Sequence, residues 1–221
     1  MRIISVAAPG NGSGKTLLVA SILRAFAGRL SAVKFTTVFK DGVNCPRTEK
    51  ACACRELHGR FTVVTDPKTL LMEQTDTGRL SQAGARQVLW CLAQPDAHRE
   101  AWDHVRINLL EPTEGVVTEG NTAIPILRPD LLLMVMSPSI PRARWKPDAW
   151  DLARRAEVVM INSFNASADA LRTLAEEVAA ARNGELPSIQ DVSRPLAEWQ
   201  DPGPLTMLAA LMGTLPEPAG D

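Results

Sequence analysis

The chain has 221 residues, a length that suits one domain with a short extension. Apolar residues make up 45% and charged residues 22% of it, as in globular proteins that bury a hydrophobic core. Its 24 basic and 25 acidic residues nearly cancel, so no overall field attracts nucleic acid or an anionic membrane. No apolar run approaches the roughly 18 residues of a membrane-spanning helix, and residues 1–8 lack the cleavage region of a signal peptide. We therefore expect a cytoplasmic protein that binds neither nucleic acid nor membrane.

Apolar runs and helical patterns alternate along the chain. In chain order, we predict a buried strand at 2–8, an apolar helix at 15–26, strands at 32–38 and 61–65, a helical turn at 80–85 and a strand at 87–92. Then follow a helix at 97–105, strands at 115–119 and 130–136, a helix at 147–155, a strand at 157–162 and a helix at 168–182. This order predicts a single α/β domain with a mainly parallel sheet of about seven strands and helices on both faces.

A glycine-rich segment joins the first predicted strand to the first helix. Residues 8–16 read Ala-Pro-Gly-Asn-Gly-Ser-Gly-Lys-Thr. In such a loop, successive backbone N–H groups form an anion site, and the helix N-terminus adds its partial positive charge. We expect Lys15 to reach the outer phosphates of ATP or GTP and Thr16 to place its hydroxyl on Mg²⁺. The remaining predicted nucleotide-binding residues of the loop are Gly10, Asn11, Gly12, Ser13 and Gly14.

This motif indicates a P-loop NTPase domain. The alternative interpretation is a glycine-rich turn that binds nothing. The loop is a variant, because Pro9 stands where the usual pattern has its first glycine. We assign residues 1–184 to this P-loop nucleotide-binding domain. Residues 185–221 form a proline-containing C-terminal extension with a short helix at 205–212.

A P-loop needs a carboxylate from a neighbouring strand to complete its Mg²⁺ site. Glu119 ends a buried strand and precedes glycine, which places it at the edge of the sheet where ligands bind in this fold class. The alternative is a solvated loop acid. Asp41, Asp66 and Asp76 compete for a second role at the metal.

The strand at 157–162 ends in Asn162, whose amide offers the donor and acceptor that suit a purine edge. A strand-end asparagine is equally a good turn former. Ser163 and Asn165 replace the lysine and aspartate of the guanine-selective pattern, so both ATP and GTP stay open.

Residues 39–60 form an irregular insertion that contains Cys45, Cys52 and Cys54. Together with His58, these thiols are close enough in sequence to hold Zn²⁺ or an iron–sulfur cluster, although the spacing is not standard for either. Loop thiols without a ligand role and a redox-active pair are the alternatives. Cys91 lies inside a predicted strand and is interpreted as a core residue.

A second polar cluster follows the strand at 130–136, where Arg142, Arg144 and Lys146 lie in a proline-rich loop. If the strands are parallel, this loop is at the same edge as the phosphate loop. It either captures an anionic substrate or phosphate or is a solvated connector.

Four segments together resemble molybdopterin-guanine dinucleotide biosynthesis protein B (MobB) and its divergent relatives. They are the phosphate loop, the strand around Lys34, the segment at 76–85 that runs Asp-Thr-Gly-Arg-Leu-Ser-Gln-Ala-Gly-Ala, and the Glu-Gly strand end at 117–121. The resemblance implies a P-loop GTPase-like fold, Mg²⁺, a role near cofactor maturation and a homodimer. In this segment, Asp76 and Arg79 are candidates for contacting substrate, phosphate or the partner subunit.

The same features resemble, more loosely, dethiobiotin synthetase and the cobyrinate amidating enzymes. This resemblance implies that Lys34 and Lys40 bind an anionic substrate or the phosphoryl group in transfer; the alternative is a solvated charge at a strand end. We expect an enzyme that hydrolyses NTP or transfers a phosphoryl group in cofactor or small-molecule biosynthesis, with Lys15, Thr16, Glu119 and Lys34 as its catalytic residues. The alternatives are an ATP-dependent ligase and a nucleotide-gated adapter or metallochaperone that serves a partner enzyme.

Overall fold

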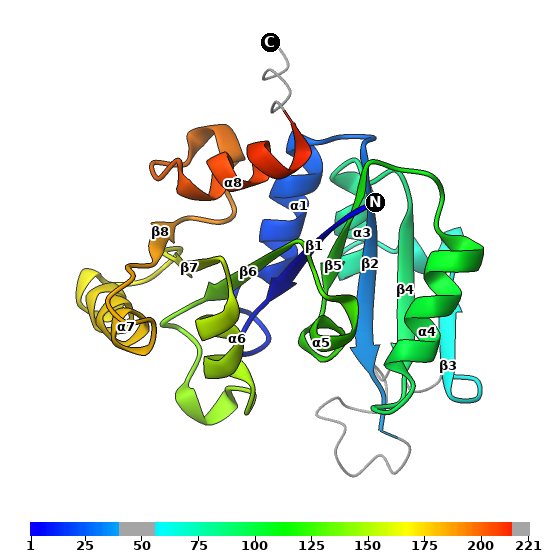
Figure 1. The fold of residues 1–221 in the computed structure, drawn as a ribbon, viewed down its shortest axis with the longest axis horizontal. Helices are drawn as coiled ribbons and strands as arrows, with labels where there is room; N and C mark the ends of the chain where they lie inside the picture. The colour runs from blue at the N-terminus through cyan, green and yellow to red at the C-terminus, as the bar shows by residue number, and fades with distance from the viewer. Residues whose placement is uncertain (40–55, 214–221) are drawn as a thin grey trace.

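The computed structural model describes residues 1–39 and 56–213, which build one eight-stranded sheet (Figure 1). Its strand order is β3-β4-β2-β5-β1-β6-β7-β8. The strands are β1 (Arg2–Ala7), β2 (Leu30–Thr37), β3 (Phe61–Val64), β4 (Val88–Ala93), β5 (Gly115–Glu119), β6 (Leu131–Met136), β7 (Val158–Asn162) and β8 (Ser188–Gln190). Only the pairing of β3 with β4 is antiparallel. The predicted α/β fold with a mainly parallel sheet is confirmed.

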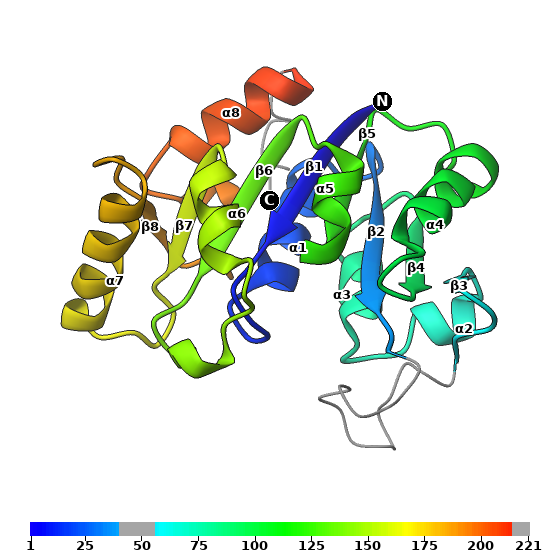
Figure 2. The ribbon, with the colours of Figure 1, turned by 60° about the horizontal axis from the view of Figure 1, so that its bottom comes forward.

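Helices cover both faces of the sheet, as Figures 1 and 2 show. On one face, α1 (Lys15–Ala25), α3 (Asp76–Gln82) and α8 (Gly203–Met212) enclose a core with apolar residues of the central strands. On the other face, the core lies beneath α4 (His98–His104), α5 (Ile124–Leu127), α6 (Ala149–Arg155) and α7 (Ala168–Ala181). A sheet buried on both faces explains why β6 is a continuous apolar run and why the central residues of β1 and β5 are buried.

Several elements differ from those expected from the sequence; α5, for example, was not predicted. The eighth strand, β8, has only three residues and buries its two polar side chains while Ile189 is exposed, yet it pairs in parallel with the end of β7. Helix α3 begins at Asp76, four positions before the predicted turn, because the Thr75 side chain accepts a hydrogen bond from Gly78 N and caps it. The short helix α2 (Pro67–Leu70) was not expected and is capped in the same way by Asp66.

The segment beyond residue 184 takes part in the sheet and in the core. It supplies β8, and α8 packs with α1 in the same hydrophobic cluster. Val192 O and Arg194 O both accept a hydrogen bond from the Ser21 hydroxyl of α1, at 3.2 Å each.

Across the described ranges, we find no helix with the length and apolar character that crossing a membrane demands.

His98 is a buried titratable group that is expected to make stability depend on pH. Its side chain is 1% exposed, its Nε2 lies 3.0 Å from Thr37 Oγ1, and its Nδ1 has no hydrogen-bond partner among the described residues. Burial lowers the pKa of His98, so the unfolded state takes up a proton at a higher pH than the folded state. Stability is therefore expected to fall as the pH drops below about 6.5, by at most about 1.4 kcal/mol per pH unit for one proton.

Denaturant unfolding at pH 7, 6 and 5 checks this prediction. His98→Gln is expected to show a smaller loss of unfolding free energy across this range than the wild-type chain. His104→Gln is the matched control, because His104 is exposed in the same helix. Parallel pH profiles for the wild type and His98→Gln would contradict the assignment.

Candidate functional site

The phosphate loop lies at the carboxyl end of β1, between this central strand and α1. Gly14 is the N-cap of α1 and has φ of 106°, a left-handed conformation that favours glycine. A Cβ atom there would lie 2.8 Å from Val192 Cγ2 and 3.0 Å from Asn162 Nδ2. The glycine thus lets the loop turn tightly beneath its neighbours while the first N–H groups of α1 face the loop.

Lys15 is folded back over its own loop. Its ammonium donates to Gly10 O at 3.0 Å, and the Ser13 hydroxyl donates to the same carbonyl at 3.1 Å. Burial is the main cause that lowers the pKa of Lys15 to about 8, opposed by the charge of Glu119. The loop therefore holds a largely desolvated cation at the position where the motif predicts a phosphate contact.

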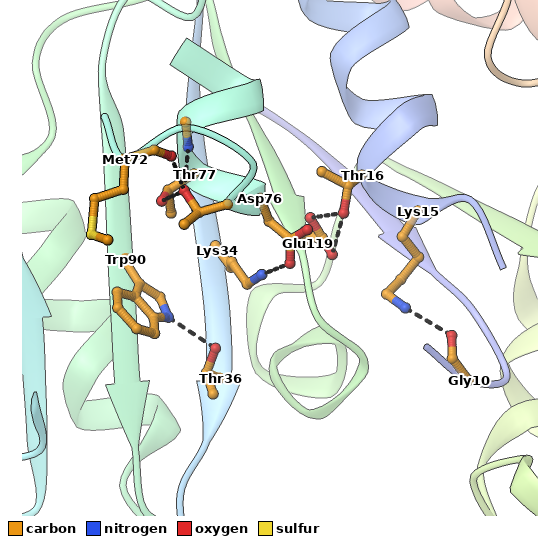
Figure 3. Close-up of polar contacts among 12 residues, drawn as sticks. Gly10, Lys15, Thr16, Lys34, Thr36, Met72, Asp76, Thr77, Trp90 and Glu119 are labelled. Atoms are coloured by element: carbon orange, nitrogen blue, oxygen red, sulfur yellow. Dashed lines mark hydrogen bonds and ion pairs between the residues drawn. The ribbon is translucent and has the colours of Figure 1, made fainter. Parts of the chain in front are cut away.

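Thr16, in the first turn of α1, meets Glu119 at the end of β5 (Figure 3). The Thr16 hydroxyl is 3.1 Å from each carboxylate oxygen of Glu119. Glu119 is 5% exposed, and burial raises its pKa despite the opposing charges of Lys34 and Lys15. A buried carboxylate and a hydroxyl are hard oxygen donors of the kind that Mg²⁺ prefers, so these residues fit the metal that the loop implies.

An ion pair between Lys34 and Asp76 borders Glu119 (Figure 3). Lys34 is in register with Glu119 on the neighbouring strand, and Asp76 begins α3. Burial acts to raise the pKa of Asp76, but the charge and hydrogen bond of Lys34, with smaller effects of Thr16 and Arg79, lower it overall. The structure thus joins residues that lie far apart in the chain into one cluster of alternating charge.

Asn121 is a site residue that the sequence reasoning did not single out. It is 2% exposed, and its amide accepts from Ala8 N at 3.2 Å and donates to Ala8 O at 3.0 Å. The amide thereby fixes the chain where β1 enters the phosphate loop. In the sequence, the preceding Gly120 could have indicated Asn121. The φ of 136° at Gly120 and its close approach to Phe35 O allow the sharp turn after Glu119.

Asn162 lies against the phosphate loop. Its Nδ2 donates to Ser13 O at 3.5 Å, and its Oδ1 accepts from Phe164 N at 3.2 Å. Both groups of the amide thus have backbone partners. This arrangement gives Asn162 a role in holding the loop, in addition to the base contact predicted from its strand-end position.

A pocket of about 350 Å³ opens beside Asn162, at the carboxyl ends of β7 and β8. Gln190 lines it and is 5% exposed, and its Nε2 has no hydrogen-bond partner in the described part of the chain. The pocket is lined by Ser163, Phe164, Asn165, Ile189, Gln190, Asp191, Arg194, Glu198, Trp199 and Gln200. Because β8 is too short to be expected from the sequence, this pocket was not predicted.

The other predicted site residues lie outside the cluster around Glu119. Arg142 forms an ion pair with Glu177 of α7, and its Cζ lies 3.7 Å from the centroid of the Trp145 ring. Its charge thus connects its own loop to α7. Arg144, Arg79 and Asn11 are exposed side chains. Asp66 is engaged as the cap of α2, where its carboxylate accepts from Thr69 N at 3.0 Å.

The predicted metal ligands Cys45, Cys52 and Cys54, together with Lys40 and Asp41, lie outside the described residues. Among the residues that the structure does describe, no group of three or more His, Cys, Asp or Glu side chains could hold a metal ion. Cys91 is a buried core residue of β4, and burial raises the pKa of its thiol to about 12.

Two solved structures are similar to the chain at low sequence identity. No protein-family model matches the chain, and no curated protein matches it. The chain resembles the solved structure of the MinD cell division protein from Aquifex aeolicus at 12% identity and a TM-score of 0.42, covering 96% of this chain and 95% of that one. It resembles a MinC:MinD cell division protein complex from the same organism at 12% identity and a TM-score of 0.45, covering 100% and 99%.

The strand order and the position of the phosphate loop define the fold. The glycine-rich loop follows the central strand β1, between the neighbours β5 and β6, and leads directly into α1. Glu119 reaches this loop from the adjacent strand. The chain therefore has the α/β fold of the P-loop NTPases, with the loop, a carboxylate and an ion pair gathered at one edge of its sheet.

Proposed function

We propose that this protein is a Mg²⁺-dependent enzyme that binds ATP or GTP and hydrolyses or transfers the terminal phosphoryl group. The contact between Thr16 and Glu119 beside Lys15 carries this proposal, because it joins the two oxygen donors that a P-loop needs for its metal. When bound between them, Mg²⁺ would neutralise charge on the outer phosphates.

Each loop residue has a defined task in this proposal. The backbone N–H groups around Gly14 and the start of α1 bind phosphate oxygens, since they point out of a helix N-terminus. Lys15 exchanges its bond to Gly10 O for a phosphate oxygen and stabilises the charge that develops there. Asn121 and Asn162 keep the loop in place through their backbone contacts.

The pocket beside Asn162 is the proposed site for the nucleoside. Its lining residues Ser163 and Asp191 directly adjoin Asn162 and Val192 in the chain. These two neighbours contact the phosphate loop, Asn162 at Ser13 O and Val192 beside Gly14. The exposed Phe164 ring can stack on a base, and the buried Gln190 amide supplies an uncommitted donor.

The ion pair of Lys34 and Asp76 supports transfer to a small anionic acceptor. The Lys34 side chain is 12% exposed, and Lys34 lies in register with Glu119, the proposed metal ligand. An incoming carboxylate or phosphate would replace part of its pairing with Asp76. This acceptor site and the resemblance to MobB favour a role in the biosynthesis of a cofactor or another small molecule.

A thermal-shift series with ATP, GTP and inorganic triphosphate, each with and without Mg²⁺, tests the proposal. A ligand at a hundred times its dissociation constant is expected to stabilise the folded chain by about 2.7 kcal/mol. We expect a rise in Tm that needs Mg²⁺ and is larger for one of the two nucleotides.

Phe164→Ala tests the nucleoside end separately. It is expected to weaken the binding of the preferred nucleotide and to leave the response to inorganic triphosphate unchanged. If neither nucleotide changes Tm at millimolar concentration with Mg²⁺, the proposed function is wrong.

A further inference from the structure

The loop that connects β6 to α6, residues 137–148, packs directly on the phosphate loop. Lys146 N donates a 2.7 Å hydrogen bond to Pro9 O. A Cβ atom at Gly10 would lie 3.2 Å from both Arg144 O and Ile140 Cγ2, and one at Gly12 would lie 3.3 Å from Ile140 Cδ1. The main chain at Lys146 is thus fixed beside the first residues of the phosphate loop.

The three cations of this loop differ in where their charge lies. The Arg142 guanidinium is paired with Glu177 and stacked on Trp145. Arg144 is exposed to solvent. Lys146 is partly buried, and its ammonium has neither an ion pair nor a hydrogen bond with any other described residue.

Lys146 is also close to Lys15 and Glu119. Its charge is among the causes that lower the pKa of Lys15. Burial lowers the pKa of Lys146 itself, and the charges of Asp148 and Glu119 oppose that effect. Asp148, two positions further on, is tied to the same region through its 3.4 Å contact with Asn121 Nδ2. The ammonium therefore belongs to the metal and outer-phosphate end of the site, not to the nucleoside pocket.

The charges around Lys146 favour an anionic ligand. Lys34 is neutralised by Asp76, whereas a nucleoside triphosphate brings several negative charges to a region that also contains Glu119. A desolvated ammonium without a partner costs free energy, and an anionic ligand removes that cost. We propose that Lys146 is a second phosphate-binding lysine, which contacts the outer phosphates of the bound nucleotide together with Lys15.

This inference rests on the proposed function, and its test separates the two. Binding of the preferred nucleoside triphosphate, diphosphate and monophosphate, each with Mg²⁺, is measured by calorimetry on the full chain. The variants are Lys146→Ala, Lys146→Gln and Lys146→Arg. Arg154→Ala is the control, because it removes an exposed cation from the adjacent helix α6.

We expect Lys146→Ala and Lys146→Gln to weaken triphosphate binding at least tenfold and monophosphate binding much less. Lys146→Arg should restore part of the affinity, and Arg154→Ala should match the wild type. Because Lys146→Gln keeps the aliphatic stem and the backbone bond to Pro9, it remains informative if the alanine variant is unstable. Unchanged triphosphate affinity, or an equal loss for all three ligands, would overturn the role of Lys146 alone. A wild-type chain that binds no nucleotide would overturn the proposed function and this inference with it.

Discussion

Replacing Lys15 by alanine is expected to abolish turnover, with a loss of at least about a hundredfold in kcat and a clear loss of triphosphate affinity. The side chain is the cation of the phosphate loop, and it is already desolvated against Gly10 O. A preorganised charge in a site of low dielectric stabilises a developing phosphate charge far more than a solvated one does. Phosphate release from the nucleotide preferred by the wild type measures the effect.

Lys68→Ala provides the matched control for this variant. Lys68 is an exposed lysine of α2, so its removal changes the net charge equally and leaves the loop intact. Phosphate release that continues at the wild-type rate in Lys15→Ala would exclude the proposed mechanism. Comparison of the two melting curves without ligand shows whether either variant is misfolded.

Glu119→Gln is expected to change activity and stability in opposite directions. Turnover should fall by at least about a hundredfold and lose its dependence on Mg²⁺, because the amide is a poor substitute for a carboxylate at a metal. Stability without ligand should rise at pH 7. Burial raises the pKa of Glu119, so the ionised carboxylate destabilises the folded state at every pH above its unfolded value of about 4.5.

The gain in stability should therefore shrink as the pH approaches 4.5, where both states take up the proton. Urea unfolding at pH 7 and pH 5 measures it, with Glu176→Gln as control, because Glu176 is exposed on α7. A variant that keeps wild-type Mg²⁺-dependent turnover would remove Glu119 from the metal site. A variant that is less stable at pH 7 would show that its charge is stabilising instead.

The central part of the site could be predicted from the sequence because its signals are local. The glycines before Lys15 and Thr16 identify the loop in a single segment, and Glu119 is marked by the end of its own strand. Parallel strands then bring these residues to the same edge of the sheet, which explains why the pair of Thr16 and Glu119 was expected.

Contacts between distant segments could not be predicted in the same way. Arg142, Arg144 and Lys146 are all cations of one loop in the sequence, and only the fold distinguishes them. Arg142 pairs with Glu177 and stacks on Trp145, whereas Arg144 is exposed and Lys146 is partly buried beside Pro9. Strand β8 has too few residues for a periodic signal, so the pocket at its end was not foreseen. The double hydrogen bond of Asn121 with Ala8 joins residues 113 positions apart.

The central place of β1 in the sheet also affects how the chain folds while it is being synthesised. Both neighbours of this first strand come from later segments, since Ser5 Oγ contacts Thr118 Oγ1 across 113 positions and β6 ends only at Met136. At a translation rate of about 5–20 residues per second, β1 and the apolar helix α1 wait on the order of ten seconds for their partners. During that interval the nascent chain presents an unpaired strand and an uncovered apolar helix. Chaperone binding to this N-terminal segment is therefore expected to protect the future phosphate site from aggregation until β5 and β6 have emerged.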